Sequence, residues 1–193
     1  MDHVVNLWAP ILLSAALVFV ASSISWMVLP FHHKEWKGLP QEDAFRGTIT
    51  SMGIGPGQYC FPHCDDMKKM KDPAFKGKME SGPQGTLSVW ARRRPMPLCL
   101  GFSFAFYILV GVFVAYIGSL AVPQGAAYLT VFRITGTAAV MGYALGFIPG
   151  AFWFGRSVSS ILVELVDGIV YGLLTAGAFA WLWPTTAVPV VGG

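Results

Sequence analysis

Long apolar runs dominate the chain and leave one extended polar segment between them. The runs cover residues 4–30, 98–122, 134–154 and 158–183. Each of them is long enough to cross a bilayer as a helix, which takes about 20 residues. The pattern predicts an all-α integral membrane protein with four transmembrane helices.

The predicted division of the chain follows from these runs. Residues 1–30 hold the first helix, residues 31–97 form an insert, and residues 98–193 hold the other three helices, at about 98–122, 128–154 and 158–183. The third helix begins at 128 if the apolar stretch Tyr128–Phe132 belongs to it. Arg133 then lies either at the outer end of this span or one turn inside it.

The polar insert has its own short-range signals. Leu39–Arg46 is typical of a short helix with proline and acids in its first turn, and Asp72 with Pro73 starts a second helix. Tyr59–Phe61 and Gly85–Ala91 have the composition of strands that could pair. We predict a small α+β insert between helices 1 and 2.

Small residues recur every four positions in three of the spans. Residues four apart share one face of a helix, and small side chains on that face let another backbone approach closely. The predicted helix-packing residues are Gly111, Ala115 and Ser119 in the second span, Ala138, Gly142, Gly146 and Gly150 in the third, and Gly168, Gly172, Ala176 and Ala180 in the fourth.

Composition and charge support a membrane location and suggest an orientation. Hydrophobic residues make up 54% of the chain and charged residues only 12%, which is unusual for a soluble domain. Eleven of the 13 Lys and Arg residues lie in the insert against seven acids, a net charge of +4. Loops with Lys and Arg next to the membrane spans stay on the cytoplasmic side. We expect a multi-pass membrane protein with a cytoplasmic insert and both termini outside.

Two acids inside the fourth span, Glu164 and Asp167, are the first candidate site. An ionised side chain costs about 2.5–3.5 kcal/mol at mid-bilayer, so both should point into the bundle. One interpretation is a proton or cation site with Tyr171 and Tyr143 nearby. The other is structural: hydrogen bonding between helices, pairing with Arg156, or pairing with a cation of another subunit. Arg133 is expected to anchor the third span at the interface.

A second candidate lies in the insert, where Cys60, His63 and Cys64 follow His32 and His33. Thiolate and imidazole together can hold zinc. The spacing matches neither a paired Cys-x-x-Cys knuckle nor a haem attachment motif. Buried thiols and a turn histidine are the alternative, so the sequence predicts no cofactor unless zinc binds here.

The basic clusters of the insert suggest its partner. They comprise Lys68, Lys69, Lys71, Arg92, Arg93 and Arg94. Beside a membrane, such charges attract anionic lipid headgroups at about 1 kcal/mol each. Nucleic acid is not expected, because the insert has no aromatic-basic platform. There is also no phosphate-binding loop, nucleophile elbow or His-Glu-x-x-His pair, which disfavours an enzyme.

The order of several short segments resembles a group of bacterial inner-membrane proteins with no known activity. These segments are Phe31-His32-His33, Leu39-Pro40-Gln41-Glu42-Asp43, Pro56-Gly57-Gln58-Tyr59, Met70-Lys71-Asp72-Pro73 and Phe154-Gly155-Arg156. The resemblance implies an envelope protein of similar layout, located in the bacterial inner (plasma) membrane, and carries no activity across.

Three functions are compatible with these features. The first is association, as a homo-oligomer or as an accessory or structural subunit of a larger membrane complex, with the basic insert against lipid. The second is a small proton or cation transporter or channel that uses Glu164 and Asp167. The third is a metal-binding membrane enzyme that uses Cys60, His63 and Cys64.

Overall fold

The computed structural model describes residues 6–185, and 66% of the chain is helical. The chain divides into two compact units. The helical unit comprises residues up to Trp36, Pro95–Ala151 and the residues from Arg156 onward. The insert unit comprises Lys37–Arg94 together with Phe152–Gly155. The segment 31–36, which the sequence pattern placed with the insert, therefore groups with the helices.

Four helices of the helical unit are long and apolar enough to cross a membrane, as predicted. Helix α2 spans Trp8–Met27, α5 spans Met96–Ala121 and α8 spans Val158–Trp181. The third candidate span, Tyr128–Trp153, consists of α6 (Tyr128–Val140), a π-helical turn η3 (Met141–Leu145) and α7 (Ile148–Trp153). The protein therefore has the layout of a multi-pass membrane protein.

A tight turn joins the third and fourth spans. Gly155 has a φ of 68°, a left-handed conformation that favours glycine, and the amide of Arg156 donates to the Ala151 carbonyl at 2.9 Å. Ser157 then caps α8, because its hydroxyl accepts a hydrogen bond from the Ser160 amide at 3.2 Å. Arg156 is therefore held at the start of α8.

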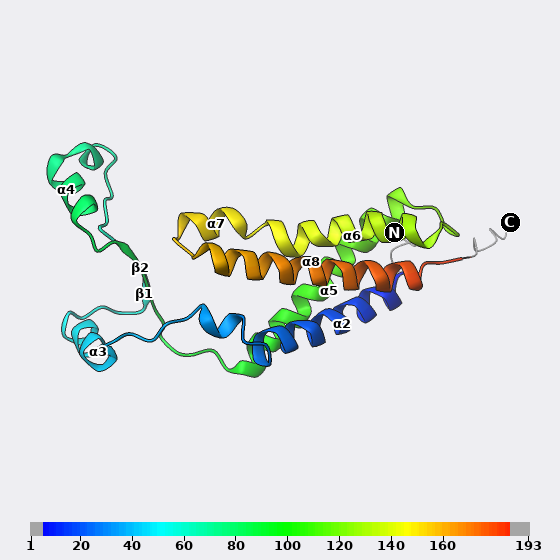
Figure 1. The fold of residues 1–193 in the computed structure, drawn as a ribbon, viewed down its shortest axis with the longest axis horizontal. Helices are drawn as coiled ribbons and strands as arrows, with labels where there is room; N and C mark the ends of the chain where they lie inside the picture. Colours follow the sequence, from blue (N-terminus) through cyan, green and yellow to red (C-terminus); the bar gives the residue numbers. More distant parts are fainter. Residues whose placement is uncertain (1–5, 186–193) are drawn as a thin grey trace. The chain divides into compact units, whose positions relative to one another are not determined.

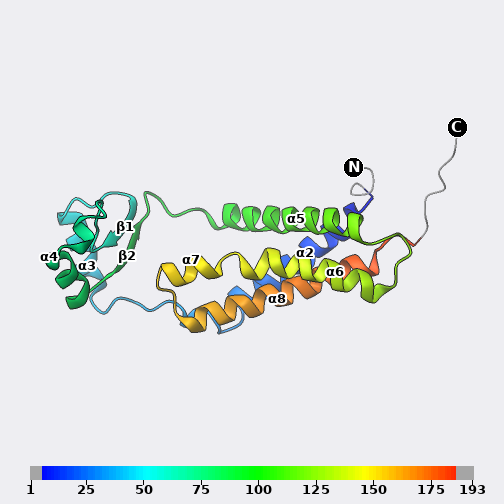
Figure 2. The ribbon, with the colours of Figure 1, turned by 90° about the horizontal axis from the view of Figure 1, so that it is seen from above.

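The four spans pack in a fixed pattern of neighbours. Helix α8 packs against α6 and α2, and α5 packs against α2 and α6 (Figures 1 and 2). Their shared core contains the fully buried Val131, Ala139 and Phe179 and the almost fully buried Val114. Many other apolar side chains of these helices, such as Phe102, Phe113 and Leu162, are exposed, as expected where lipid or another protein surrounds a bundle.

Two glycines of α8 bring its backbone against the third span. A Cβ atom at Gly168 would lie 2.8 Å from the Cα of Ala144, and one at Gly172 would lie 3.0 Å from the backbone nitrogen of Val140. In return, a Cβ atom at Gly136 would lie 3.0 Å from the Cβ of Ala176. The contact is therefore close on both sides, as small residues permit.

The other predicted packing residues differ in what they meet. Three of them, Ala115, Ala176 and Ala180, are buried, while Ser119 is half-buried and Ala138 packs at the edge of the core. Two glycines meet side chains of other helices: Gly111 lies against Ile11 of α2, and Gly142 lies against Val110 of α5. Gly146 and Gly150, in contrast, have no neighbouring atom of residues 6–185 within 4 Å of an added Cβ. The third span therefore meets α8 through Gly136, Val140 and Ala144, and part of its predicted ridge stays uncovered.

The insert unit contains the predicted elements, but the helix predicted over Leu39–Arg46 begins only at Glu42 and continues to Ser51. Helix α3 spans Glu42–Ser51, strand β1 Gly57–Phe61, the short 3-10 helix η2 Lys69–Lys71, helix α4 Pro73–Ser81 and strand β2 Gly85–Val89. The strands pair in antiparallel fashion with Tyr59 opposite Leu87. The Asp72 carboxylate caps α4 by accepting from the Ala74 amide at 2.9 Å. The predicted strand pair and the predicted cap are both confirmed.

The substitution Gly168→Ala should destabilise the bundle, because its Cβ would meet backbone atoms that have little freedom to move. We expect a loss of about 1–3 kcal/mol in the free energy of unfolding, measured by thermal unfolding of the purified protein in detergent. Gly101→Ala on α5 is the matched control, since no atom lies within 4 Å of its added Cβ. Equal stability of the two variants would contradict the close α6–α8 contact.

Candidate functional site

Asp167 is the centre of a polar cluster inside the helical unit. Its carboxylate accepts hydrogen bonds from the Ser25 hydroxyl at 2.8 and 2.9 Å and from the Tyr171 hydroxyl at 3.1 Å. It also lies 3.0 Å from Nε2 of His32. Ser25 comes from α2 and Tyr171 from the next turn of α8, so this carboxylate bonds two helices together.

His32 lies between two carboxylates. It belongs to η1 (His32–Lys34), the short 3-10 helix that follows α2, and its side chain is only 2% exposed. Nδ1 is 2.7 Å from Oε1 of Glu35, while Nε2 faces Asp167. The ring stacks on Trp26, with centroids 3.8 Å apart. Only the doubly protonated imidazolium donates to both carboxylates at once.

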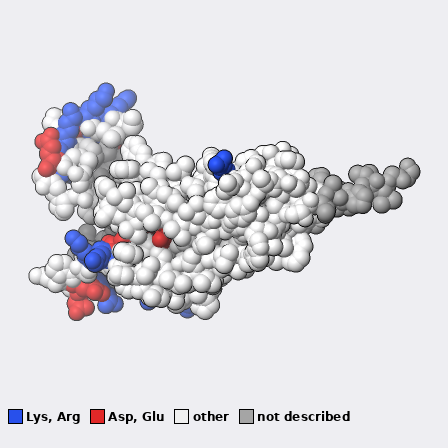
Figure 3. Space-filling model, turned by 45° about the vertical axis from the view of Figure 1, so that its right-hand side comes forward, with Lys and Arg blue, Asp and Glu red and all other residues white. Residues whose placement is uncertain are grey.

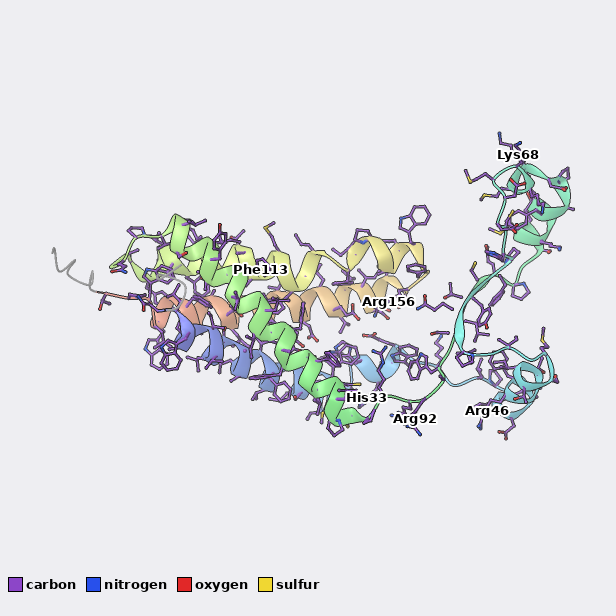
Figure 4. The ribbon with its side chains drawn as sticks, turned by 180° about the vertical axis from the view of Figure 1, so that it is seen from behind. His33, Arg46, Lys68, Arg92, Phe113 and Arg156 are labelled. Atoms are coloured by element: carbon purple, nitrogen blue, oxygen red, sulfur yellow. The ribbon has the colours of Figure 1, made fainter. Side chains whose placement is uncertain are left out.

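Arg156 extends the cluster to the start of α8. Its guanidinium donates two hydrogen bonds to Glu164, at 2.6 and 2.8 Å, and a third to Glu35 at 3.3 Å. The hydrogen bond to Glu164 raises the pKa of Arg156 above its ordinary value, so the guanidinium stays charged. Figure 4 shows Arg156 at the turn that precedes α8.

The cluster has more acidic than basic groups. Its three carboxylates, Glu35, Glu164 and Asp167, face one guanidinium and one imidazole. The carboxylate side chains are 7%, 20% and 16% exposed, so water screens them only in part. Even with His32 protonated, these five groups carry a net negative charge. Figure 3 shows how few charged side chains the helices present in that view.

An open cleft lies beside this cluster, between α2, the first half of α5, η3 and α8. Its volume is about 390 Å³, and Glu164 and Asp167 line it. The other lining residues are mainly aromatic: Trp26, Phe102, Phe106, Tyr107, Tyr143, Phe147 and Tyr171. Neighbouring rings within this set, such as Tyr143 and Tyr171, lie 6.0–6.3 Å apart in tilted or edge-to-face arrangements. The cleft therefore combines aromatic surface with carboxylates.

Of the intramembrane polar residues expected from sequence, three are brought together here. Glu164, Asp167 and Tyr171 share the cleft, and Glu164 pairs with Arg156 as the structural interpretation anticipated. Arg133 lies apart, exposed in the second turn of α6, where Thr137 donates to its carbonyl at 2.8 Å.

Sequence reasoning missed three members of the cluster, Ser25, His32 and Glu35. The sequence pattern assigns no role to Ser25 or Glu35, and it predicts His32 only as a possible metal ligand. One signal could have found them: Asp167 needs hydrogen-bond donors, and few polar side chains lie near the ends of the apolar runs. The contacts of Ser25 and His32 with Asp167 nevertheless span more than 130 residues of sequence.

The candidate zinc residues are found in two places. Both ring nitrogens of His32 face carboxylates, and His33 is exposed. In the insert unit, Sγ of Cys60 is 3.3 Å from Nδ1 of His63, whereas the Cys64 thiol donates to the Asp66 carbonyl. Within residues 6–185, no three His, Cys, Asp or Glu side chains are arranged to hold a metal ion. Zinc binding stays a prediction.

The predicted lipid-binding residues all lie on the surface of the insert unit. Lys68, Lys69, Lys71 and Arg92–Arg94 are exposed, and they form no ion pair within the described part of the chain. Figure 4 shows Lys68 and Arg92 extending away from the ribbon. These cations are therefore available to an external anionic surface.

Comparisons of the chain with protein-family models, with curated proteins and with solved structures find no match. The assignment of function therefore depends on the geometry of the cluster, the cleft and the helix surfaces.

The substitution His32→Ala should destabilise the helical unit. It removes the ring that bridges Glu35 and Asp167 and leaves each of these partly buried carboxylates with one hydrogen-bond donor fewer, at a cost of about 1–3 kcal/mol. Thermal unfolding in detergent measures the loss. The neighbouring His33→Ala is the control, because His33 is exposed, and it should leave the melting temperature almost unchanged. If both variants melt like the wild type, the cluster does not hold the helices together.

Proposed function

We propose that this protein acts by association in a bacterial inner membrane, as a homo-oligomer or as an accessory subunit of a larger membrane complex. The observation that carries the proposal is the uncovered part of the third span. Among the described residues, no atom would lie within 4 Å of a Cβ added at Gly146 or Gly150, whereas Gly168 and Gly172 of α8 are in tight contact with the third span. A small-residue face on a membrane helix suits the approach of another helix.

The polar cluster supports a structural role at the same time. Each of its charged groups already has a partner within the chain, and the bonds connect α2, η1 and the start of α8. Such a cluster fixes the ends of the helices relative to one another. A stable bundle with a defined outer face is what association with a partner requires.

The sequence also disfavours a relay across the whole bilayer. Helices α2 and α5 contain no Asp, Glu, Lys, Arg or His, and Arg133 is the only charged residue of the third span. A chain of ionisable groups is the usual proton route in pumps and transporters. In the proposed orientation, the cluster lies toward the cytoplasmic side and the insert contacts anionic lipid headgroups through its basic clusters.

Native mass spectrometry of protein extracted gently from its own membrane tests association. We expect a defined complex, either several copies of this chain or this chain with other polypeptides, with anionic lipid retained. Gly146→Leu combined with Gly150→Leu should weaken the complex, because bulky side chains keep the helices apart. Gly101→Leu is the control for added bulk in a span. A monomer from the wild type, or a complex that the double variant leaves intact, contradicts the proposed interface.

Labelling of Cys60 tests the proposed side of the insert. Cys60 is exposed, and in a Cys64→Ser, Cys99→Ser background it is the single thiol. A membrane-impermeant maleimide should label it in inside-out vesicles and leave it unlabelled in intact cells. Labelling in intact cells would place the insert outside and reverse the orientation.

A second candidate function, cation binding, is favoured by one observation. The cluster carries a net negative charge next to an open cleft, and a partly buried site of this sign attracts cations. Glu164 and Asp167 line that cleft. The cation would then be a ligand or a transported substrate of the same bundle.

A further inference from the structure

We propose that the cleft beside Asp167, between α2, α5, η3 and α8, binds an organic ammonium group. The group could belong to a lipid headgroup or to a small free cation, and the chemistry of recognition is the same for both. This inference deepens the cation-binding candidate and does not depend on association.

The aromatic lining is the first argument. Five aromatic residues from four elements line the cleft: Trp26 of α2, Phe106 and Tyr107 of α5, Tyr143 of η3 and Tyr171 of α8. An ammonium group within about 6 Å of a ring centroid is attracted by the negative face of the ring, and cages of several rings recognise quaternary ammonium. The carboxylates of Glu164 and Asp167 add the formal charge that such a cage needs.

The hydrogen bonds that the carboxylates already accept disfavour the binding of a metal ion or another bare inorganic cation. Both Glu164 oxygens accept from Arg156, and Oδ2 of Asp167 already has contacts with Ser25, His32 and Tyr171. Calcium requires six to eight oxygen ligands, and magnesium an octahedron of them. A diffuse organic cation needs no free lone pairs in a fixed geometry. It needs negative potential and apolar contact, which this cleft provides.

A neighbouring groove offers room for an apolar tail. This groove of about 260 Å³ lies between α2 and α5 and is lined mainly by apolar side chains, among them Phe19, Met27 and Leu100. It shares Trp26 and Tyr107 with the cleft. An amphiphile could therefore place its ammonium group in the cleft and its chain in the groove, whereas a free cation would occupy the cleft alone.

Binding of choline to the full-length protein in a neutral detergent tests the site. Saturation-transfer NMR reports the affinity, and 3,3-dimethyl-1-butanol is the neutral isostere, with carbon in place of nitrogen. We expect the isostere to bind about tenfold more weakly, because it lacks the charge. Equal affinity for the two compounds would show a plain apolar groove and overturn the proposal.

Two phenylalanines of α5 form a matched pair of variants. Phe106 lines the cleft, whereas Phe113, labelled in Figure 4, lies two turns further along and lines neither the cleft nor the groove. Phe106→Leu should weaken choline binding about 2- to 30-fold, the range of a single cation–π contact. Phe113→Leu should leave it unchanged. Phe106 is 46% and Phe113 60% exposed, so neither variant should prevent folding.

Substitutions of Tyr143 separate the contribution of its ring to choline binding from that of its hydroxyl. Tyr143→Phe keeps the ring and removes a buried hydroxyl that, among the described residues, has no hydrogen-bond partner. Choline binding should survive this change and should fall in Tyr143→Leu. Loss of choline binding in Tyr143→Phe would show that the hydroxyl, and not the aromatic ring, holds the ligand, and it would refute the proposal.

A further experiment with lipids identifies the source of the ammonium group. Native mass spectrometry in mixed micelles of phosphatidylethanolamine and phosphatidylglycerol should show retained phosphatidylethanolamine that choline displaces, if the ligand is a headgroup. Choline binding without phosphatidylethanolamine retention indicates a free cation. If neither binds, the proposal fails. Sodium NMR on the same sample then shows whether an inorganic cation binds, in which case the broader cation-binding candidate survives.

Discussion

The placement of the Asp167 charge within an apolar helix is the constraint on which the helical unit depends. A carboxylate there is stable only if donors from other parts of the chain reach it. Ser25 reaches it from α2, His32 from the 3-10 helix that follows, and Tyr171 from the next turn of α8. One side chain thereby ties the end of the first span to the fourth. Arg156, through Glu35 and Glu164, ties the same segment to the start of α8.

Backbone packing determines where this carboxylate lies. Gly168 follows Asp167 directly, and its contact with Ala144 is closer than any side chain would allow. The glycine therefore fixes the position of α8 along the third span at the point where the charge must meet its donors. Small residues and polar bonds thus act together: the first bring the helices close, and the second select one alignment among those that close packing permits.

The sequence was sufficient for features that depend on local patterns. The four spans follow from runs of apolar residues, and the cap at Asp72 and the strand pair of the insert follow from short signals. The face of the third span that meets α8 could not be predicted in the same way. A ridge of every fourth residue from Ala138 to Gly150 assumes an unbroken α-helix, whereas the π-helical turn at Met141–Leu145 rotates the residues after it. The partners of Asp167 lie far away in sequence, and only the tertiary structure brings them near.

The two proposals place different demands on the third span, and the structure separates them by one residue. Gly146 belongs to the uncovered ridge, while the adjacent Phe147 lines the cleft. A partner helix on the ridge would therefore border the wall of the cleft. If association changed the position of that wall, it would change the affinity for an ammonium group, and thermodynamic linkage requires the ligand to change the affinity for the partner by the same factor. An accessory subunit and a binding site are accordingly compatible functions of one bundle.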